Sequence, residues 1–166
     1  MNTAQYYIDH LNLQPHPEGG FYTETYRATE QIPGDALPNR FSGERSFSTA
    51  IIYLIEQGDH SLFHRIQSDE CWHFYAGETL LIHIIENRGN YYCIKLGTDI
   101  AAGETFQFVV PATAWFAAEP APKSSFSLAG CTVAPGFDFA DFEIADWAKL
   151  LASFPQHNAI INRIGR

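Results

Sequence analysis

The sequence predicts an all-β fold, an antiparallel sandwich or barrel formed by one domain over residues 1–166. Between residues 46 and 133, about eight short runs rich in β-branched and aromatic residues follow one another at roughly 8–12-residue spacing. Turn residues separate these runs, and helical periodicity is confined to the two ends of the chain. This order is typical of a sandwich or barrel and not of alternating strands and helices.

The N-terminal third is expected to hold one helix, one strand and a long loop. Residues 3–12 read as a short helix with Thr3 as its N-cap. Prolines and glycines between residues 15 and 20 force a turn, and Phe21–Arg27 has the Thr- and Tyr-rich composition of a strand. Residues 28–45 contain prolines and glycines with little periodicity, which predicts a long loop.

The rest of the chain is expected to be strands followed by one helix. The predicted strands are residues 46–56, 61–66, 70–76, 79–86, 91–96, 105–110, 114–117 and 124–133. Asn87–Asn90 is a hairpin turn, and Asp146–Phe154 is an amphipathic helix that Pro155 ends. Several strands are apolar on both faces, so we expect the outer faces to meet a second sheet or a second subunit.

Charge and cysteine content limit the functional classes. The chain has 19 acidic and 10 basic residues, a formal charge of −9, which argues against binding to nucleic acid or an anionic membrane. Its three cysteines are widely spaced among apolar neighbours and are expected to be reduced core residues, not zinc ligands. The N-terminus lacks the features of a signal peptide, and no apolar run reaches the roughly 20 residues of a membrane span. We therefore expect a cytoplasmic protein.

The window from residue 58 to residue 77 concentrates titratable and aromatic side chains. It resembles the first cupin motif, G(x)5HxH(x)3E(x)6G, in which Gly58, His64, Glu70 and Gly77 stand in register. Ile66 occupies the place of the second motif histidine. Further along, residues 103–116 resemble the second motif loosely, with a phenylalanine at the histidine position.

A broader resemblance is to a cupin family of unassigned function found in bacteria, fungi and plants. Its blocks correspond to residues 13–27, 48–55, 64–77, 109–116 and 130–145. The resemblance implies a double-stranded β-helix, the cupin jelly roll, with short N- and C-terminal helices, commonly as a homodimer. It implies no established reaction.

A weaker likeness connects the chain to the sugar-nucleotide 3,5-epimerases, which are cupins that need no metal. Residues 20–24 resemble their RGxFxE segment, and residues 61–64 resemble the segment that ends in their catalytic base. The likeness implies that His64 is the base. The catalytic acid of those enzymes is a tyrosine after the second motif, whereas this chain has no tyrosine after Tyr92.

The donor set does not predict a metal cofactor. Of the three histidines and one glutamate of a typical cupin site, only His64 and Glu70 remain, and metal sites usually need three or four protein ligands. His73 would point away from Glu70 on a regular strand, unless a bulge at Cys71 reversed it. We therefore expect no cofactor; a metal, if present, would be bound by His64 and Glu70.

We predict that His64 and Glu70 are the catalytic pair. Histidine titrates near neutrality, and Glu70 could fix its tautomer or act as the partner acid. The alternative is a pair that only satisfies two buried polar groups. The residues expected to line the ligand pocket are Arg45, Trp72, His73, Tyr75, Trp115 and Phe116. For the aromatic members the alternative is core packing, and for Arg45 it is a salt bridge.

Three functions follow from this reading of the sequence. The first is a metal-independent isomerase or epimerase acting on a carbohydrate-like or other polar metabolite, with His64 as base. The second is a non-catalytic module that binds a small molecule in the same pocket, and the third is a metal-dependent cupin oxygenase. The expected partners are a small-molecule ligand and a second copy of the chain.

Overall fold

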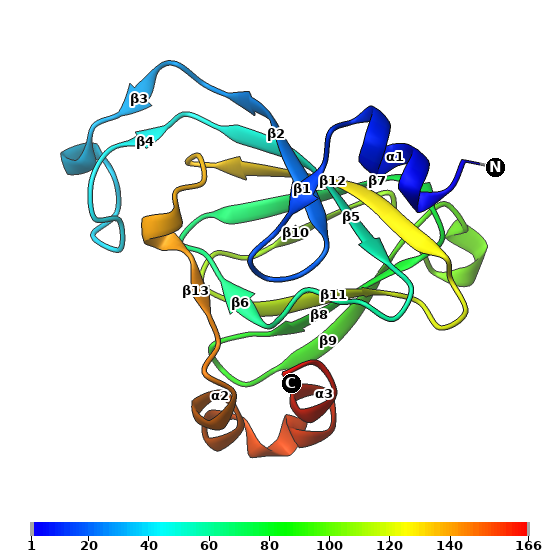
Figure 1. The fold of residues 1–166 in the computed structure, drawn as a ribbon. Helices are drawn as coiled ribbons and strands as arrows, with labels where there is room; N and C mark the ends of the chain where they lie inside the picture. Colours follow the sequence, from blue (N-terminus) through cyan, green and yellow to red (C-terminus); the bar gives the residue numbers. More distant parts are fainter. Residues whose placement is uncertain (1, 166) are drawn as a thin grey trace.

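The computed structural model describes residues 2–165 and shows two antiparallel sheets packed face to face (Figure 1). The six-stranded sheet has the order β1 (Gln14–Pro15), β2 (Phe21–Arg27), β5 (Thr49–Glu56), β12 (Phe126–Ala134), β7 (Asp69–Gly77) and β10 (Gln107–Val110). The five-stranded sheet has the order β13 (Glu143–Ile144), β6 (His64–Arg65), β11 (Trp115–Pro120), β8 (Leu80–Ile85) and β9 (Tyr91–Leu96). A separate pair, β3 (Gln31–Ile32) and β4 (Arg45–Ser46), extends away from both sheets.

The main core lies between the two sheets. Strand side chains alternate between faces, so every second residue of β5, β7, β8, β11 and β12 points inward. Trp72, Ile82, Ile84 and Phe116 are almost completely buried in this layer. One end of the layer is not filled by apolar side chains, and that end carries the candidate site.

The helices of the chain cover the outer faces of the sheets. Helix α1 (Ala4–His10) packs with Leu13 on the six-stranded sheet, against Leu54 and Leu128. Helices α2 (Trp147–Ser153) and α3 (Asn158–Ile164) lie together on the five-stranded sheet (Figure 1). Both outer faces are thus covered in part by the chain's own helices, where the sequence led us to expect a second sheet or a second subunit.

Most predicted elements are present, with shifted ends. The side chain of Thr3 accepts a hydrogen bond from the Tyr6 amide, which confirms the predicted cap. The strands Phe21–Arg27 and Tyr91–Leu96 have the predicted bounds. The single strand expected over residues 46–56 is interrupted after Ser46, where the chain leaves β4 before it enters β5.

Three predictions of local structure need correction. Residues 28–45 are not entirely loop, because β3 pairs with β4 across them. The strand predicted over residues 61–66 is reduced to β6, since the segment before it makes loop contacts instead of ladder pairs. Helix α3 was not predicted, because the sequence analysis ended the last helix at Pro155. That proline begins a short 3₁₀ turn, η4 (Pro155–His157), that leads into α3.

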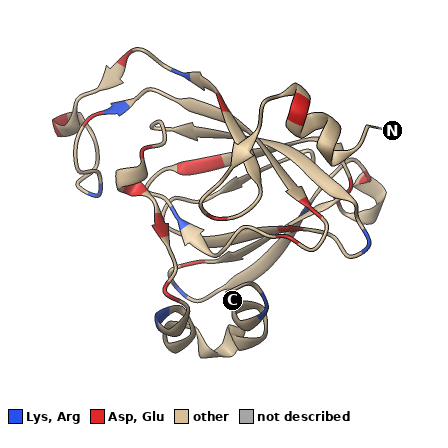
Figure 2. Cartoon of the chain, in the orientation of Figure 1, with Lys and Arg blue, Asp and Glu red and all other residues tan. Residues whose placement is uncertain are grey.

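Three further 3₁₀ turns, η1 (Gly34–Ala36), η2 (Ile100–Ala102) and η3 (Phe139–Asp141), connect strands. Lys and Arg residues are few, and their positions are spread over separate elements of the chain (Figure 2). None of the helices described between residues 2 and 165 has the length and apolar character needed to cross a membrane.

Candidate functional site

A cavity of about 220 Å³ opens between the sheets, next to β2. Its walls come from β1, β2, β5, β6, β7 and β12, together with the segment that follows β12. The lining residues are Gln14, His16, Glu18, Tyr22, Thr23, Glu24, Arg27, Thr49, Ile51, His64, Ile66, Glu70, Cys131, Val133, Phe137, Phe139 and Phe142. Two histidines, three glutamates and five further aromatic or arginine side chains therefore surround a space of metabolite size.

Glu18 reaches the cavity from the turn between β1 and β2. His16 and Gly20 close this turn through a backbone hydrogen bond of 2.9 Å. Gly19 and Gly20 have positive φ angles of 116° and 67°, a conformation that side chains with a Cβ rarely adopt. A Cβ on Gly20 would also lie 2.6 Å from the carbonyl oxygen of Leu54. The two glycines let the turn lie against β5 with Glu18 pointing inward.

Glu18 and His64 form a buried pair. Glu18 Oε2 lies 3.1 Å from His64 Nε2, and the two side chains are 7% and 3% exposed. The backbone of Leu62 positions both residues: its amide donates to the Glu18 carbonyl at 2.8 Å, and its carbonyl accepts from His64 Nδ1 at 2.7 Å. Glu70 is the predicted partner of His64, whereas in the structure Glu18 contacts the imidazole.

The backbone contact determines where the proton of His64 lies. A carbonyl oxygen only accepts, so Nδ1 carries the hydrogen and Nε2 presents its lone pair to Glu18. Burial lowers the pKa of His64 to about 3, with a smaller lowering from His16. Burial raises the pKa of Glu18 well above its usual range, and the nearby Glu70 raises it further. The neutral carboxyl of Glu18 therefore donates its proton to a neutral imidazole.

Glu70 is a second buried carboxyl, on the sheet opposite to that of His64. It lies on β7 between Val110 and Val133, is 8% exposed and lines the cavity. Burial raises its pKa to about 7, and a hydrogen bond with the Cys131 thiol acts in the opposite direction. Glu70 thus exchanges its proton near neutral pH, unlike the neutral Glu18–His64 pair.

His16 completes the titratable group around Glu18. Its Nδ1 lies 3.7 Å from Glu18 Oε2 and accepts from the Glu18 amide at 3.3 Å. The ring packs edge-on against Tyr22, with 4.5 Å between centroids. Burial lowers the pKa of His16 to about 4, so this imidazole is also neutral at physiological pH.

The cavity mouth carries one compensated charge pair. Arg27 donates from Nε and Nη2 to the two carboxylate oxygens of Glu24, at 2.9 and 2.7 Å. Its Nη1 donates to the carbonyl oxygen of Phe137 at 3.0 Å. The side chains of Arg27 and Glu24 are 43% and 39% exposed, which places them at the solvent boundary.

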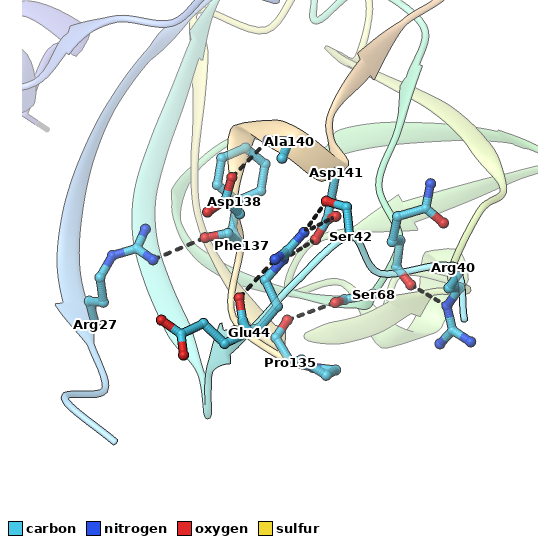
Figure 3. Close-up of polar contacts among 12 residues, drawn as sticks. Arg27, Arg40, Ser42, Glu44, Ser68, Pro135, Phe137, Asp138, Ala140 and Asp141 are labelled. Carbon is cyan, nitrogen blue, oxygen red and sulfur yellow. Dashed lines mark hydrogen bonds and ion pairs between the residues drawn. The ribbon is translucent and has the colours of Figure 1, made fainter. Parts of the chain in front are cut away.

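The segment after β12 forms an aromatic wall, defined as Phe137, Phe139 and Phe142. Centroids of the three rings lie 5.0 to 6.0 Å apart, with interplanar angles of 66° to 85°. Polar contacts fix the backbone of this wall from several elements (Figure 3). Phe137 accepts from Arg27, while Asp141 is bound by Arg45 from β4.

Arg45, predicted as a pocket residue, therefore acts behind the wall. Its Nε and Nη2 donate to the two carboxylate oxygens of Asp141 at 2.7 and 2.5 Å, and both side chains are 5% exposed. Ser68 donates to the carbonyl of Pro135 at 2.7 Å, at the start of the same segment (Figure 3). Arg45 supports the wall instead of facing the cavity.

The five predicted aromatic and histidine residues also lie outside the cavity. Trp72 is buried in the core, 1% exposed, and its indole nitrogen has no hydrogen-bond partner among the described residues. His73 and Tyr75 lie on the outer face of β7, where His73 contacts Thr132 and Gln107. Trp115 stacks on Arg65. Phe116 lies closest to the site, because its ring packs 4.0 Å from that of His64.

The bulge that could have turned His73 inward lies elsewhere. Cys71 pairs with Thr132 and His73 pairs with Gly130 in unbroken register, so His73 and Glu70 point to opposite faces. The register shifts only after Phe74, where Tyr75 is the extra residue. The period-two rule therefore placed His73 correctly and excluded it as a neighbour of Glu70.

The sequence analysis did not assign Glu18 and His16 to the site. Both lie in the segment PHPEGG, which the sequence analysis treated as a turn. The sequence feature that could have indicated them is the pair of titratable side chains between turn-forming prolines and glycines. Their role depends on the contact between Glu18 and His64, which are 46 residues apart, and no local pattern contains that contact.

The family match covers most of these elements. The family described as Cupin superfamily (DUF985) matches residues 5–145, which include both sheets and the whole cavity lining. This chain belongs to that cupin family. The predicted resemblance and the predicted cupin jelly roll are both confirmed.

Relatives of this cupin span fungi, protozoa and bacteria. The uncharacterized protein YML079W of Saccharomyces cerevisiae is 28% identical over 158 residues, covering 84% of this cupin and 74% of the yeast protein. Protein SO0799 of Shewanella oneidensis superposes with a TM-score of 0.90 at 38% identity, covering 100% of this cupin and 99% of that chain. A hypothetical protein from Leishmania major gives 0.89 at 34% identity, with 98% of each chain covered.

A distant neighbour shares the fold alone. Oxalate decarboxylase from Bacillus subtilis gives a TM-score of 0.54 at 11% identity, with 90% of this cupin and 36% of that chain covered. The names of the nearer relatives state no activity. Function therefore has to be argued from the cavity itself.

The cavity residues do not form a metal-binding set. Within residues 2–165, no group of three or more His, Cys, Asp or Glu side chains is arranged to hold a metal ion. Ile66 places an apolar side chain in the cavity, and both nitrogens of His64 already bind Leu62 and Glu18. The donor set does not fit a cupin metal.

Proposed function

We propose that this cupin is a metal-independent isomerase that moves protons on a small polar metabolite. The observation that carries the proposal is the presence of two separate proton-handling groups in one cavity. Glu70 comes from the six-stranded sheet, and His64, with Glu18 on its Nε2, comes from the five-stranded sheet. Isomerisation of this kind needs one group to accept a proton and another to donate one.

The protonation state of each group decides which one accepts a proton and which one donates it. Glu70 has a pKa of about 7, so its carboxylate is available to accept a proton from a substrate carbon or hydroxyl. The Glu18 carboxyl holds a proton that it shares with His64 and can donate to the substrate. Transfer leaves Glu70 protonated and Glu18 ionised, so the net charge of the cavity wall does not change. A buried site favours such a step because no new net charge has to be buried.

This assignment changes the role that the sequence suggested for His64. Both of its nitrogens are engaged, and its burial disfavours protonation. His64 therefore acts in the proposal as the residue that holds and orients the Glu18 proton. Glu70 is the base.

The test measures incorporation of solvent deuterium into small molecules. A metabolite extract in D₂O is incubated with the full chain, and mass spectrometry identifies compounds that gain deuterium over a protein-free sample. We expect gain with the wild-type chain, its loss in Glu18→Gln and Glu70→Gln, and no change in Glu30→Gln, a substitution of an exposed residue outside the cavity lining. No deuterium gain, or gain at wild-type rates in both cavity variants, would refute the isomerase.

A non-catalytic binding module is the second candidate. It is favoured by the fact that His64 already has both nitrogens satisfied within the chain, as in a purely structural pair. A binding module would give ligand-dependent rises in thermal stability while no compound gains deuterium. The two readouts therefore separate the two functions.

A further inference from the structure

Within residues 2–165, the cavity lining carries no uncompensated positive charge. Arg27 is the arginine among the lining residues, and its guanidinium is paired on both sides with Glu24 and with the Phe137 carbonyl. Burial keeps the pKa values of His16 and His64 near 4 and 3, so neither ring is charged at neutral pH. The cavity wall is therefore neutral or negative, according to the protonation of its buried carboxyls, and never net positive.

Arg45 and Arg65 lie in ion pairs outside the cavity lining. Arg45 binds Asp141 behind the aromatic wall, and Arg65 binds Glu143 at 2.6 Å on the surface. An anionic ligand would thus face buried carboxyls without a free cation to compensate it. A positively charged ligand would instead be attracted by these carboxyls.

Aromatic rings supply the other half of a cation site. Phe137, Phe139 and Phe142 line the cavity with interplanar angles of 66° to 85° between their rings. Tyr22 and His16 add two more rings on the side of β2. Ring faces attract organic cations, and sets of rings at right angles form the cages that enclose alkylammonium groups.

The wall is held in place before any ligand binds. Phe137 accepts a hydrogen bond from Arg27 (Figure 3). Its amide donates to Thr49 Oγ1 at 2.9 Å, and the buried Arg45 binds Asp141. Asp138 Oδ1 accepts from the Ala140 amide at 2.8 Å within the segment. Preorganised rings bind without an ordering cost, which favours affinity for a small ligand.

We propose that the ligand of this cavity is a small alkylammonium ion, with its charge between the carboxyls of Glu18 and Glu70 and its alkyl groups against the wall of Phe137, Phe139 and Phe142. This names the substrate class of the isomerase and rests on the same cavity as the proposed function. A volume of about 220 Å³ equals the liquid volume of roughly seven water molecules, enough for a compact amine.

The test compares three molecules of one shape and different charge. Choline is the cationic probe, 3,3-dimethylbutan-1-ol is its neutral isostere, and 3,3-dimethylbutanoate is the anion. Calorimetric titration of the full chain at mildly alkaline pH should show choline binding about tenfold more tightly than the alcohol, with the anion weakest. Equal or tighter binding of the alcohol or the anion, or no binding of choline, would overturn the proposal.

Two substitutions locate the site. Phe139→Ala removes a ring of the wall that is 55% exposed and should weaken choline binding about threefold or more. Phe47→Ala is the matched control, because Phe47 is 48% exposed and lies outside the cavity lining. Glu70→Gln should reduce the preference for choline over the alcohol, with Glu30→Gln as its control. An unchanged preference in both cavity variants would contradict the site.

The outcomes for binding and for catalysis are independent. Preference for choline without deuterium gain in any compound would refute the isomerase and leave the alkylammonium site intact. Deuterium gain confined to neutral or anionic compounds, with no preference for choline, would support the isomerase and refute the alkylammonium ligand.

Discussion

Glu18 Oε2 and His64 Nε2 lie 3.1 Å apart, and one residue, Leu62, binds the backbone of the first and the ring of the second. A single peptide segment thus controls the distance between a carboxyl and an imidazole that are 46 positions apart in the sequence. Since burial keeps both side chains neutral, one proton lies between them.

Glu18→Gln should separate proton transfer from structure. The amide retains a donor for His64 Nε2 but cannot release a proton, so deuterium exchange should fall by about 10²–10⁴-fold. The free energy of unfolding should change by less than about 1 kcal/mol, because one hydrogen bond replaces another. Exchange assays and urea unfolding measure the two effects. Unchanged exchange in a well-folded variant would exclude Glu18 from the chemistry.

Glu70→Gln should alter how stability depends on pH. Burial raises the pKa of Glu70 from 4.5 to about 7, so the folded chain binds more protons than the unfolded chain between these values. The stabilisation that Glu70 contributes is therefore full below a pH of about 4.5 and is lost as the pH rises through about 7. Relative to wild type, the variant should gain roughly 3 kcal/mol across this window and then level off.

Urea unfolding at a series of pH values measures this difference. His16 and His64 have lowered pKa values, so they cost stability as the pH falls below 6.5. Glu18 has a raised pKa and acts in the same direction as Glu70. These groups remain in both proteins, so their effects largely cancel in the comparison. A difference that does not vary with pH would contradict a raised pKa for Glu70.

Asp141→Asn should destabilise the chain through Arg45. The substitution leaves a guanidinium without its carboxylate at a position where both side chains are 5% exposed. Loss of one partner of a buried ion pair costs about 3–5 kcal/mol. Lys149→Ala is the control, because Lys149 is 85% exposed and solvent screens its pair with Asp146. Urea unfolding compares them, and equal effects would show that the buried pair is not specially stabilising.

The donor set also makes a prediction about metal content. The wild-type chain, purified without chelator, should carry far less than one transition-metal ion per molecule, because His64 and Glu70 are too few as ligands. Ile66→His adds a third donor that faces the same cavity and should raise the metal content. Elemental analysis of both proteins measures this. Stoichiometric metal in the wild type would contradict the conclusion that the cavity has too few ligands for a metal.

The homodimer stays a prediction, and the structure suggests where to test it. Beside the outer face of β7 and the edge strand β10, Tyr75, Phe106 and Val109 are 54%, 54% and 46% exposed. An apolar sheet edge of this kind suits a second copy of the chain. Sedimentation should show a dimer for the wild type and a monomer for Phe106→Glu. A monomeric wild type would refute the prediction.

The first cupin motif could be located from the sequence, but the residues that surround it in the folded chain could not. The spacing of Gly58, His64 and Glu70 is a local property, so it identified two cavity residues. The aromatic pocket residues were chosen because they flank the motifs in sequence. Strand alternation instead sends Trp72 into the core and Tyr75 outward, so nearness along the chain did not mean nearness to the ligand.

By itself, the sequence determined the fold class, the family and the position of His64, because strand periodicity, turn residues and motif spacing are all written in short segments. Only the tertiary structure decided that Glu18, not Glu70, contacts His64. It also decided that residues 137–142 form the aromatic wall and that Arg45 supports it. These contacts join segments far apart in the chain, and burial, which sets the proton occupancy of each carboxyl, exists only once those segments have packed together.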